Sequence, residues 1–396
     1  NTTTAANANN GVVDTDDNHT LVEIKSTTPN YTRNSYNAGT GVGRSDCTDN
    51  GDGTATCSYA QEIQNFANWF SYYRKRDLAA KASFSKVIEP LTSARVGYAT
   101  INDNASNGIR VASMNVSPTS GNKKLLLDKL FSTEPDDDTP LRDALDKTGK
   151  YFECRSGDIF GSASNSAPGN VNCPVQAAPA GTCHANYAVL ITDGYWNGAT
   201  NPGVNNADSG SGDFDGGAFA DGFSDTLADV AMHYYERDLQ PTLDNNVPTS
   251  ARDIAGYSGA VNPFKTMQQH LSLYTVGFGV NGTLGAGPSN LSAPFAWPDP
   301  VAGDAQKIDD VLHAAVNGRG LFINANNPMS FQSAMDNIMS DIKSNSGTAT
   351  AVAFNTQEVE AGTLVFRASF NTKTNSGNLV AQKVNVDGTV DNTIHW

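Results

Sequence analysis

Strand-like and helix-like segments alternate through the middle of the chain, and this alternation restricts the fold more than any other feature. The run "YAVLIT" (187–192) is continuously apolar and stands directly before Asp-Gly, as expected of a strand buried on both faces of a sheet. The runs "LSLYTVGFGV" (271–280) and "GLFIN" (320–324) also predict strands, and segments with helical periodicity separate them, at 225–239 and 307–316. The pattern predicts an α/β fold with a doubly wound, mostly parallel sheet and long loop insertions.

The segment before this region predicts a long helix that begins at a capping box. Ser58 and Gln61 have the required spacing, and Pro90 is expected to end the helix. Its apolar residues advance by three and four from Ile63 to Tyr73, and therefore share one face. Further strands are predicted at 95–101 and 108–116, and further helices at 123–131, 139–152 and around 331–342.

The two ends of the chain differ from the middle. Residues 1–57 are polar and rich in Asn, Thr and Gly, with one strand-like run at 20–25, and are expected to form an N-terminal insertion or loop region. The α/β pattern covers 58–345. From 346 to 396 short apolar runs and a "VDGTV" turn predict a small, incomplete β-rich segment.

The charge of the chain limits its partners. The 396 residues carry a net charge of -15, which repels nucleic acid and anionic membranes and suits divalent cations. No apolar run approaches the roughly 20 residues of a membrane span, and no signal peptide opens the sequence. If the protein is exported, we expect these residues to be its mature form or a fragment.

Five cysteines bear on the compartment and on stability. Cys47 and Cys57 flank a strong turn sequence and could close a small disulfide loop. Cys154, Cys173 and Cys183 lie in a stretch rich in small residues, where a disulfide would help. No CxxC pair occurs, so a zinc site built on cysteines is not expected. An oxidising compartment is the preferred interpretation, and buried free thiols are the alternative.

Asp193 and Thr139 are the candidate metal ligands. Asp193 ends the strongest strand, and ligands of doubly wound sheets bind beyond the carboxyl ends of the strands. Thr139 is predicted as the N-cap of the helix that follows, with Pro140 at its first position, and should lie at the same edge. A carboxylate with hydroxyls suits Mg²⁺, Mn²⁺ or Ca²⁺. The alternative is that Asp-Gly is only a turn and Thr-Pro only a cap.

These motifs resemble a known domain family. "DDDTPLRDAL" and "LITDG" look like the second and third metal-ion-dependent adhesion site motifs of von Willebrand factor A-type domains, which implies ligand roles for Thr139 and Asp193. Longer phrases, among them "CSYAQEIQNFANWFSYYRKRDLAAK", "ITDGYWNG", "YTVGFGV" and "HAAVNGRGLF", resemble the A-type domain of the PilY family of type IV pilus adhesins and assembly factors. The resemblance runs from about Cys57 to the end, where the sequence looks like that family's lead-in to a C-terminal β-propeller.

The resemblance implies a function and a place in the cell. It implies a binding module, not an enzyme, that is exported through the periplasm to the pilus tip at the cell surface. Implied roles are pilus assembly, twitching motility and attachment. Implied partners are minor pilins at the tip and a host or surface ligand, one of whose carboxylates can complete the metal shell.

One part of the family's metal site is missing from the sequence. The Asp-x-Ser-x-Ser motif that should follow the first strand does not occur, and "DSGSGD" (208–213) has the letters at the wrong spacing. "VVDTDDN" (12–18) offers alternate carboxylates but too short a strand. We therefore expect the first strand to lie upstream of Asn1. The alternative is a structural or assembly subunit without a functional metal site, whose sheet is completed by a strand of another chain.

Two weaker signals complete the list of candidate sites. Asp213, Asp215 and Asp221 are interleaved with glycines and could hold Ca²⁺, although a solvated acidic loop is the simpler interpretation. A hydrolase using these carboxylates with a metal is the third hypothesis. No nucleophile motif or Gly-rich phosphate loop supports it.

Overall fold

A three-stranded parallel sheet forms the centre of the molecule, as the alternation predicted. It is built from β8 (Asn186–Thr192), β11 (Leu271–Phe278) and β12 (Arg319–Ala325), with β11 in the middle. All eight residues of β11 are buried. The computed structural model describes residues 2–3, 17–18, 23–37, 43–92, 94–102, 108–136, 138–198, 201–209, 212–250, 252–253, 266–345, 351–354, 364–371 and 376–383.

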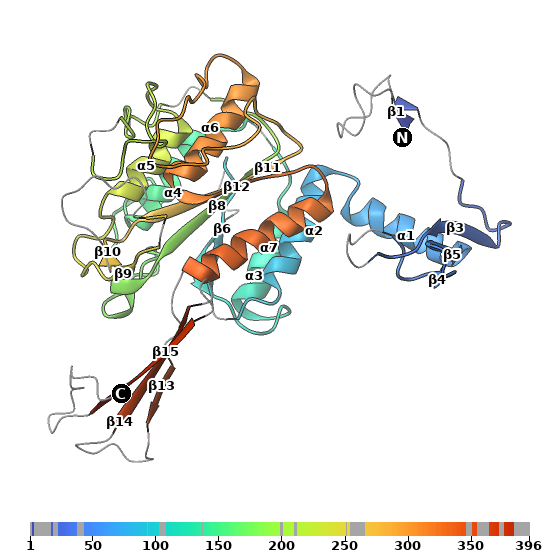
Figure 1. The fold of residues 1–396 in the computed structure, drawn as a ribbon, viewed down its shortest axis with the longest axis horizontal. Coiled ribbons are helices and arrows are strands. Elements are labelled where there is room, and N and C mark those ends of the chain that lie inside the picture. The colour runs from blue at the N-terminus through green and yellow to red at the C-terminus, as the bar shows by residue number, and fades with distance from the viewer. Residues whose placement is uncertain are drawn as a thin grey trace.

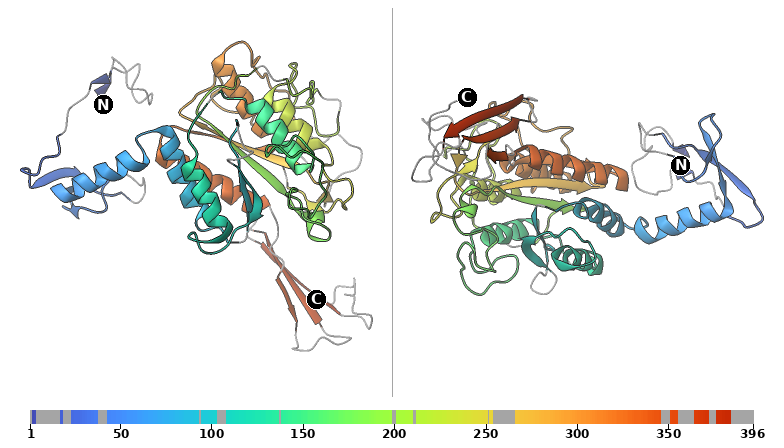
Figure 2. Two further views of the ribbon diagram at one scale, coloured as in Figure 1. Left: turned by 180° about the vertical axis from the view of Figure 1, so that it is seen from behind. Right: turned by 90° about the horizontal axis from the view of Figure 1, so that it is seen from below.

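Helices cover both faces of this sheet (Figure 2). One face packs against α4 (Leu141–Phe152), α5 (Leu227–Glu236) and α6 (Asp304–Asn317). The other face packs against α2 (Arg76–Ile88) and α7 (Pro328–Asn345). Because successive side chains of a strand point to opposite faces, Leu273 joins the first core and Tyr274 the second. The structure is thus a mixed α/β fold with a parallel sheet.

A separate antiparallel hairpin, β6 (Arg95–Tyr98) with β7 (Ile109–Ser113), continues the same layered arrangement. Val96 and Tyr98 pack with α3 (Gly121–Ser132) and the end of α2, in a third core. Val111 lies against α4, where its N–H donates to the hydroxyl of Tyr151 at 3.1 Å. Both the hairpin and the parallel sheet are therefore flanked by α2 and α4.

The two sheets are not joined by hydrogen bonds in the described part of the chain. β8 pairs only with β11, and β6 pairs only with β7. The five central residues of β8 are half-buried, whereas every residue of β11 is buried. An apolar strand whose second edge has no described neighbour is unusual, because its backbone donors and acceptors lack ladder partners.

The long N-terminal helix is two helices. The capping box of Ser58 and Gln61 is confirmed, but α1 ends early (Tyr59–Tyr72) and α2 starts after a break at residues 73–75. The apolar face that the spacing predicted for α1 is exposed, with Phe66 and Phe70 each 50% exposed. In Figure 1, α1 extends away from the α/β core. Among the described residues, the α/β core therefore does not cover the apolar face of α1.

A small antiparallel sheet before α1 was not predicted. It has the order β3 (Asn30–Asn34), β5 (Thr54–Ser58), β4 (Thr48–Asp49), and Ala55 and Cys57 are fully buried in it. The strand predicted at 20–25 is wrong for residues 23–25, which are not in a strand, and its other residues lie outside the described ones.

The predicted C-terminal strands are confirmed. β13 (Ala351–Phe354), β14 (Leu364–Asn371) and β15 (Ser376–Lys383) form an antiparallel sheet in that order, and the "VDGTV" turn lies outside the described residues. The remaining elements are short: β1 (Thr2–Thr3) with β2 (Asp17–Asn18), β9 (Val247–Pro248) with β10 (Thr266–Met267), and a 3-10 turn at Ala180–Cys183.

Two disulfides link four of the five cysteines. Cys47 pairs with Cys57, as the turn suggested, and Cys154 pairs with Cys173, while Cys183 is an exposed free thiol.

None of the helices in the described segments has the length and apolar character needed to cross a membrane.

Candidate functional site

Thr139 and Asp193 lie together at the carboxyl end of the parallel sheet. Asp193 is exposed and follows β8 directly. A Cβ added to the neighbouring Gly194 would lie 3.8 Å from the Thr139 hydroxyl oxygen, so this hydroxyl faces the Asp-Gly turn. The two candidate ligands therefore share one edge of the sheet, as their sequence positions predicted.

Asn197, in the loop after Asp193, is hydrogen-bonded to the loop that contains Thr139. Its side-chain oxygen accepts the Thr139 N–H at 2.7 Å, and its own N–H donates to the Thr139 carbonyl at 2.9 Å. Its amide also reaches a carboxylate oxygen of Asp138 at 3.4 Å. No sequence pattern indicated Asn197, because a loop-to-loop contact has no periodicity.

Thr139 is not the N-cap of the helix that follows it, so that prediction is wrong. Helix α4 begins at Leu141 with Pro140 at the cap position, and the cap makes no side-chain hydrogen bond. The Leu141 N–H instead donates to the Thr139 carbonyl at 2.9 Å. Since Asn197 holds the backbone of Thr139 outside the helix, the hydroxyl is directed to the sheet edge and not to the helix terminus.

The donors at this edge fit part of the shell of a hard dication. Thr139, Asp193 and Asp138 offer hydroxyl and carboxylate oxygens, which suit Mg²⁺, Mn²⁺ or Ca²⁺. The one cation recorded beside them, Arg76, donates to the Asp193 backbone carbonyl at 3.3 Å and not to its carboxylate. Six or more oxygens are usual for these ions, so the described residues make an incomplete site.

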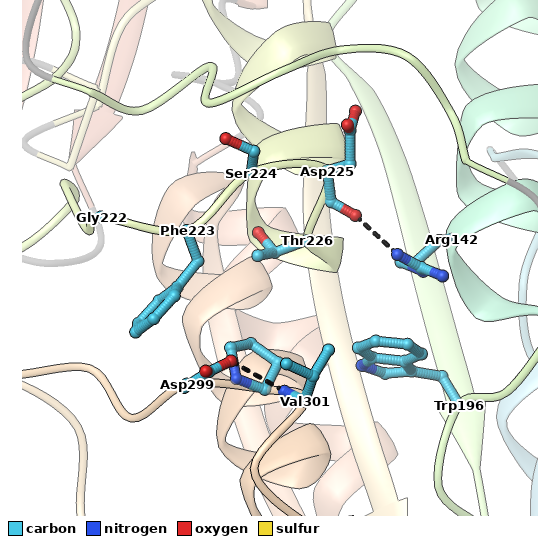
Figure 3. Close-up of a pocket in the computed structure, with 10 residues that line it drawn as sticks. Arg142, Trp196, Gly222, Phe223, Ser224, Asp225, Thr226, Asp299 and Val301 are labelled. Carbon is cyan, nitrogen blue, oxygen red and sulfur yellow. Dashed lines mark hydrogen bonds between the residues drawn. The ribbon is translucent and has the colours of Figure 1, made fainter.

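A polar pocket of about 310 Å³ lies beside this edge (Figure 3). The Arg142 guanidinium stacks on the Trp196 ring at 4.2 Å and donates to the carbonyls of Asp225, at 2.9 Å, and Gly198. Burial lowers the pKa of Arg142, although nearby acidic groups oppose the shift. Asp299 lines the opposite wall. The pocket presents both charges and the edge of an aromatic ring, a surface suited to a polar ligand.

The three carboxylates of the predicted calcium loop are not brought together as a set. Asp215 lies beside Glu236, whose pKa is raised to about 7 by burial and by the Asp215 carboxylate. Asp221 lies instead with Asp208 and His313, and Asp213 is in neither group. The residues join different neighbours because the glycines between them turn the loop sharply, with Gly216 and Gly217 both at positive φ.

The sequence matches one group of curated proteins. Type IV pilus biogenesis factor PilY1 of Pseudomonas aeruginosa strain PAO1 is 28% identical over 373 residues, which covers 84% of this chain. This chain is similar in sequence to the PilY1 proteins. The PilY1 protein of strain PAK is 28% identical over 347 residues, and that of strain UCBPP-PA14 is 28% identical over 359 residues.

The match covers only part of the PilY1 proteins. This chain spans 31% of the length of the PAO1 protein and 29% of the PAK protein. No family model matches the chain. No solved structure matches it either.

Proposed function

We propose that this chain serves in type IV pilus biogenesis as a surface-binding module of a PilY-type protein. Its relatives are named for that process, and 80–84% of the chain aligns with those of strains PAK and PAO1. In this proposal residues 58–345 form the A-type domain, 1–57 an insertion, and 346–396 the start of a further β unit. The protein works by binding and not by catalysis, at the cell surface and at the pilus tip, with minor pilins and a surface ligand as partners.

The contact between Thr139 and the turn after Asp193 is the observation that carries the binding mechanism. We propose that both residues hold a divalent cation at the sheet edge, and that a carboxylate of the bound partner completes its shell. When bound, the ion supplies a positive charge for that carboxylate. Asn197 positions the Thr139 loop, and Arg76 holds the Asp193 backbone, so that both ligands are placed before the ion binds.

Variants of the two ligands test this mechanism. In a native host that depends on the full-length protein, Asp193→Ala and Thr139→Ala are expected to reduce attachment and twitching, while surface pili remain. In the purified chain they should weaken Mn²⁺ or Mg²⁺ binding at least tenfold. Asp136→Ala, a change of an exposed carboxylate in the same loop, is the matched control. Unchanged metal binding and attachment in both ligand variants would contradict the mechanism.

The edge of β8 that has no strand partner in the described part of the chain supports a second candidate function, that of an assembly platform. We propose in this case that an extended segment from outside these residues adds to β8 between the two sheets, where α2 and α4 already cover both faces. Main-chain hydrogen bonds would then join pilus components, as in other cases of strand addition.

Hydrogen exchange distinguishes the two candidates. If a strand adds to β8, amides of 186–192 should exchange at least tenfold more slowly in the assembled pilus protein than in the isolated chain. Amides of β11, which is already paired on both sides, serve as the internal reference. Equal exchange of β8 in the two states would count against strand addition.

A further inference from the structure

A buried group of two carboxylates and a histidine lies away from Thr139 and Asp193. Asp208 and Asp221 come from the long connection between β8 and α5, and His313 comes from α6. Their potential ligand atoms all lie within 4.8 Å of one another. The side chains of Asp208, Asp221 and His313 are 0%, 4% and 2% exposed. Uncompensated carboxylates are costly at this depth, so the group needs a positive charge, which either an imidazolium of His313 or a bound cation supplies.

Each ring nitrogen of His313 faces a carboxylate, Nε2 that of Asp208 at 3.5 Å and Nδ1 that of Asp221. Its Nε2 lies 2.7 Å from the Phe219 carbonyl oxygen, which can only accept, so Nε2 carries the hydrogen. The ring stacks on Trp297, with ring centres 3.9 Å apart. Nδ1 then faces the Asp221 carboxylate at 3.4 Å. Metal-bound histidines typically donate their other ring N–H to a carbonyl or carboxylate in this way, which fixes the tautomer.

The distance of 3.4 Å between Nδ1 and the Asp221 oxygen fits two ligands of one ion. A direct N–H···O bond would bring the two atoms to about 2.7–3.2 Å. Two ligands of a tetrahedral zinc ion, each at about 2.0–2.1 Å, lie roughly 3.3 Å apart. The other Asp221 oxygen accepts the Phe223 N–H at 2.7 Å, which fixes the direction of the carboxylate.

A buried amide supplies an independent indication of a ligand. Asn317 lies one helical turn after His313 and is fully buried; its Nδ2 donates to Asp208 at 2.7 Å and to the Ala228 carbonyl. Its Oδ1 is buried without a hydrogen-bond partner in the described part of the structure. A 180° rotation of the Asn317 side-chain amide places Oδ1 against the Asp208 carboxylate. A cation between these two oxygen groups stabilises that arrangement.

We propose that Asp208, Asp221, His313 and Asn317 form a structural site for a zinc-like divalent transition-metal ion. One imidazole with oxygen ligands suits Zn²⁺ better than Ca²⁺ or Mg²⁺, which take oxygen ligands almost exclusively. The ion draws Asp208 toward the other ligands and ties the loop after β8 to α6. The site is distinct from the one proposed at Thr139 and Asp193.

Zinc binding to the full chain tests the proposal. After chelator treatment, the purified chain is expected to take up about one Zn²⁺, measured by calorimetry and by elemental analysis after desalting. His313→Gln and Asp208→Asn should weaken this binding at least tenfold. The matched control is Asp304→Asn, an exposed carboxylate of α6 outside both proposed sites, which should keep full zinc affinity. Binding of Mn²⁺ to Asp193→Ala tests the first proposed site separately, so that failures of the two proposals are distinguished.

A second measurement, made on the unaltered chain, tests the proposal even if the variants fail to fold. X-ray absorption at the zinc edge should show one imidazole nitrogen and an otherwise oxygen shell. A sulfur ligand, an uptake below about a tenth of an equivalent, or full affinity in both variants would overturn the proposal. So would nitrogen-15 shifts that show both His313 ring nitrogens protonated at neutral pH in the presence of zinc.

Discussion

Single buried acidic residues hold the loops of this molecule to its helices. Asp310 of α6 is 3% exposed, and its carboxylate accepts the N–H groups of Leu227 and Ala228 and the indole N–H of Trp196. Burial raises its pKa to about 6, although these hydrogen bonds oppose the shift. The carboxylate on one helix therefore satisfies the first N–H groups of another, α5, where the helix dipole also favours negative charge.

The pair of Asp215 and Glu236 should make stability depend on pH. The Glu236 pKa is about 7 in the folded chain and near 4.5 when unfolded, so the folded chain binds this proton more tightly. The free energy of unfolding should then fall as pH rises from about 4.5 to about 7. Glu236→Gln should remove about 1–2 kcal/mol of this dependence, after allowance for solvent screening. Urea unfolding across this pH range measures it.

Three other carboxyl groups contribute to the same slope, so the variant should flatten the curve only in part. Asp208, Asp229 and Asp310 also have raised pKa values and titrate in the same direction. Glu153→Gln is the control, since this carboxylate pairs with Arg155 and Arg237. A slope that is identical in the native chain and in Glu236→Gln would show that the Glu236 proton is not held in the fold.

At the scale of elements, two helices with the same apolar spacing differ in whether their apolar face is buried. In α7, Phe331 is fully buried and packs edge-on against Phe84, with ring centres 5.5 Å apart, and against Phe278 at 5.2 Å. In α1, Phe66 contacts only its own helix neighbours Trp69 and Phe70 among the recorded ring contacts. Periodicity predicts which residues share a face, but not whether another element covers it.

Substitutions in these two helices should differ in cost. Phe331→Ala is expected to lower the free energy of unfolding by about 3–5 kcal/mol, because it leaves a cavity between α7 and the sheet. Phe66→Ala, the matched change in α1, should cost less than about 1 kcal/mol since the ring is half exposed. Denaturant unfolding of both variants measures the difference. A large loss in Phe66→Ala would mean that the α1 face is covered in the folded protein.

At the scale of the whole molecule, the α/β core and the N-terminal sheet are joined by a short exposed connection. Residues 73–75 separate α1 from α2, and Arg74 and Lys75 are exposed there. The Cys47–Cys57 disulfide lies entirely before the break and Cys154–Cys173 entirely after it. Neither disulfide therefore ties the two parts together.

Limited trypsin digestion should cut this connection first. Cleavage after Arg74 or Lys75 should release a fragment that begins at Lys75 or Arg76 and keeps the helix and sheet content of the core. Mass spectrometry identifies the fragment and circular dichroism measures its structure. The variant Arg74→Gln with Lys75→Gln is the control and should be cut about tenfold more slowly there. Resistance of the unaltered connection would contradict the exposure of this segment.

Much of the fold could be predicted because its signals are local. The Ser58 capping box, the apolar run of β8 and the helical spacing of α7 each depend on neighbours within a few residues, and all three are present in the structure. The place of Asp193 at the end of β8 follows from the same local pattern. Predictions failed where a residue's role depends on a distant contact, as for Thr139, whose backbone is held by Asn197.

The sequence by itself thus determined the order of the core strands and helices, the net negative charge and the similarity to the PilY1 proteins. Only the tertiary structure decided that the long helix breaks, that one edge of β8 has no strand partner among the described residues, and that Asp221 joins Asp208 and His313 and not Asp213 and Asp215. The reason is physical: hydrogen-bond ladders and side-chain periodicity are set by short stretches, whereas burial, pairing of distant edges and clustering of charges depend on how those stretches pack.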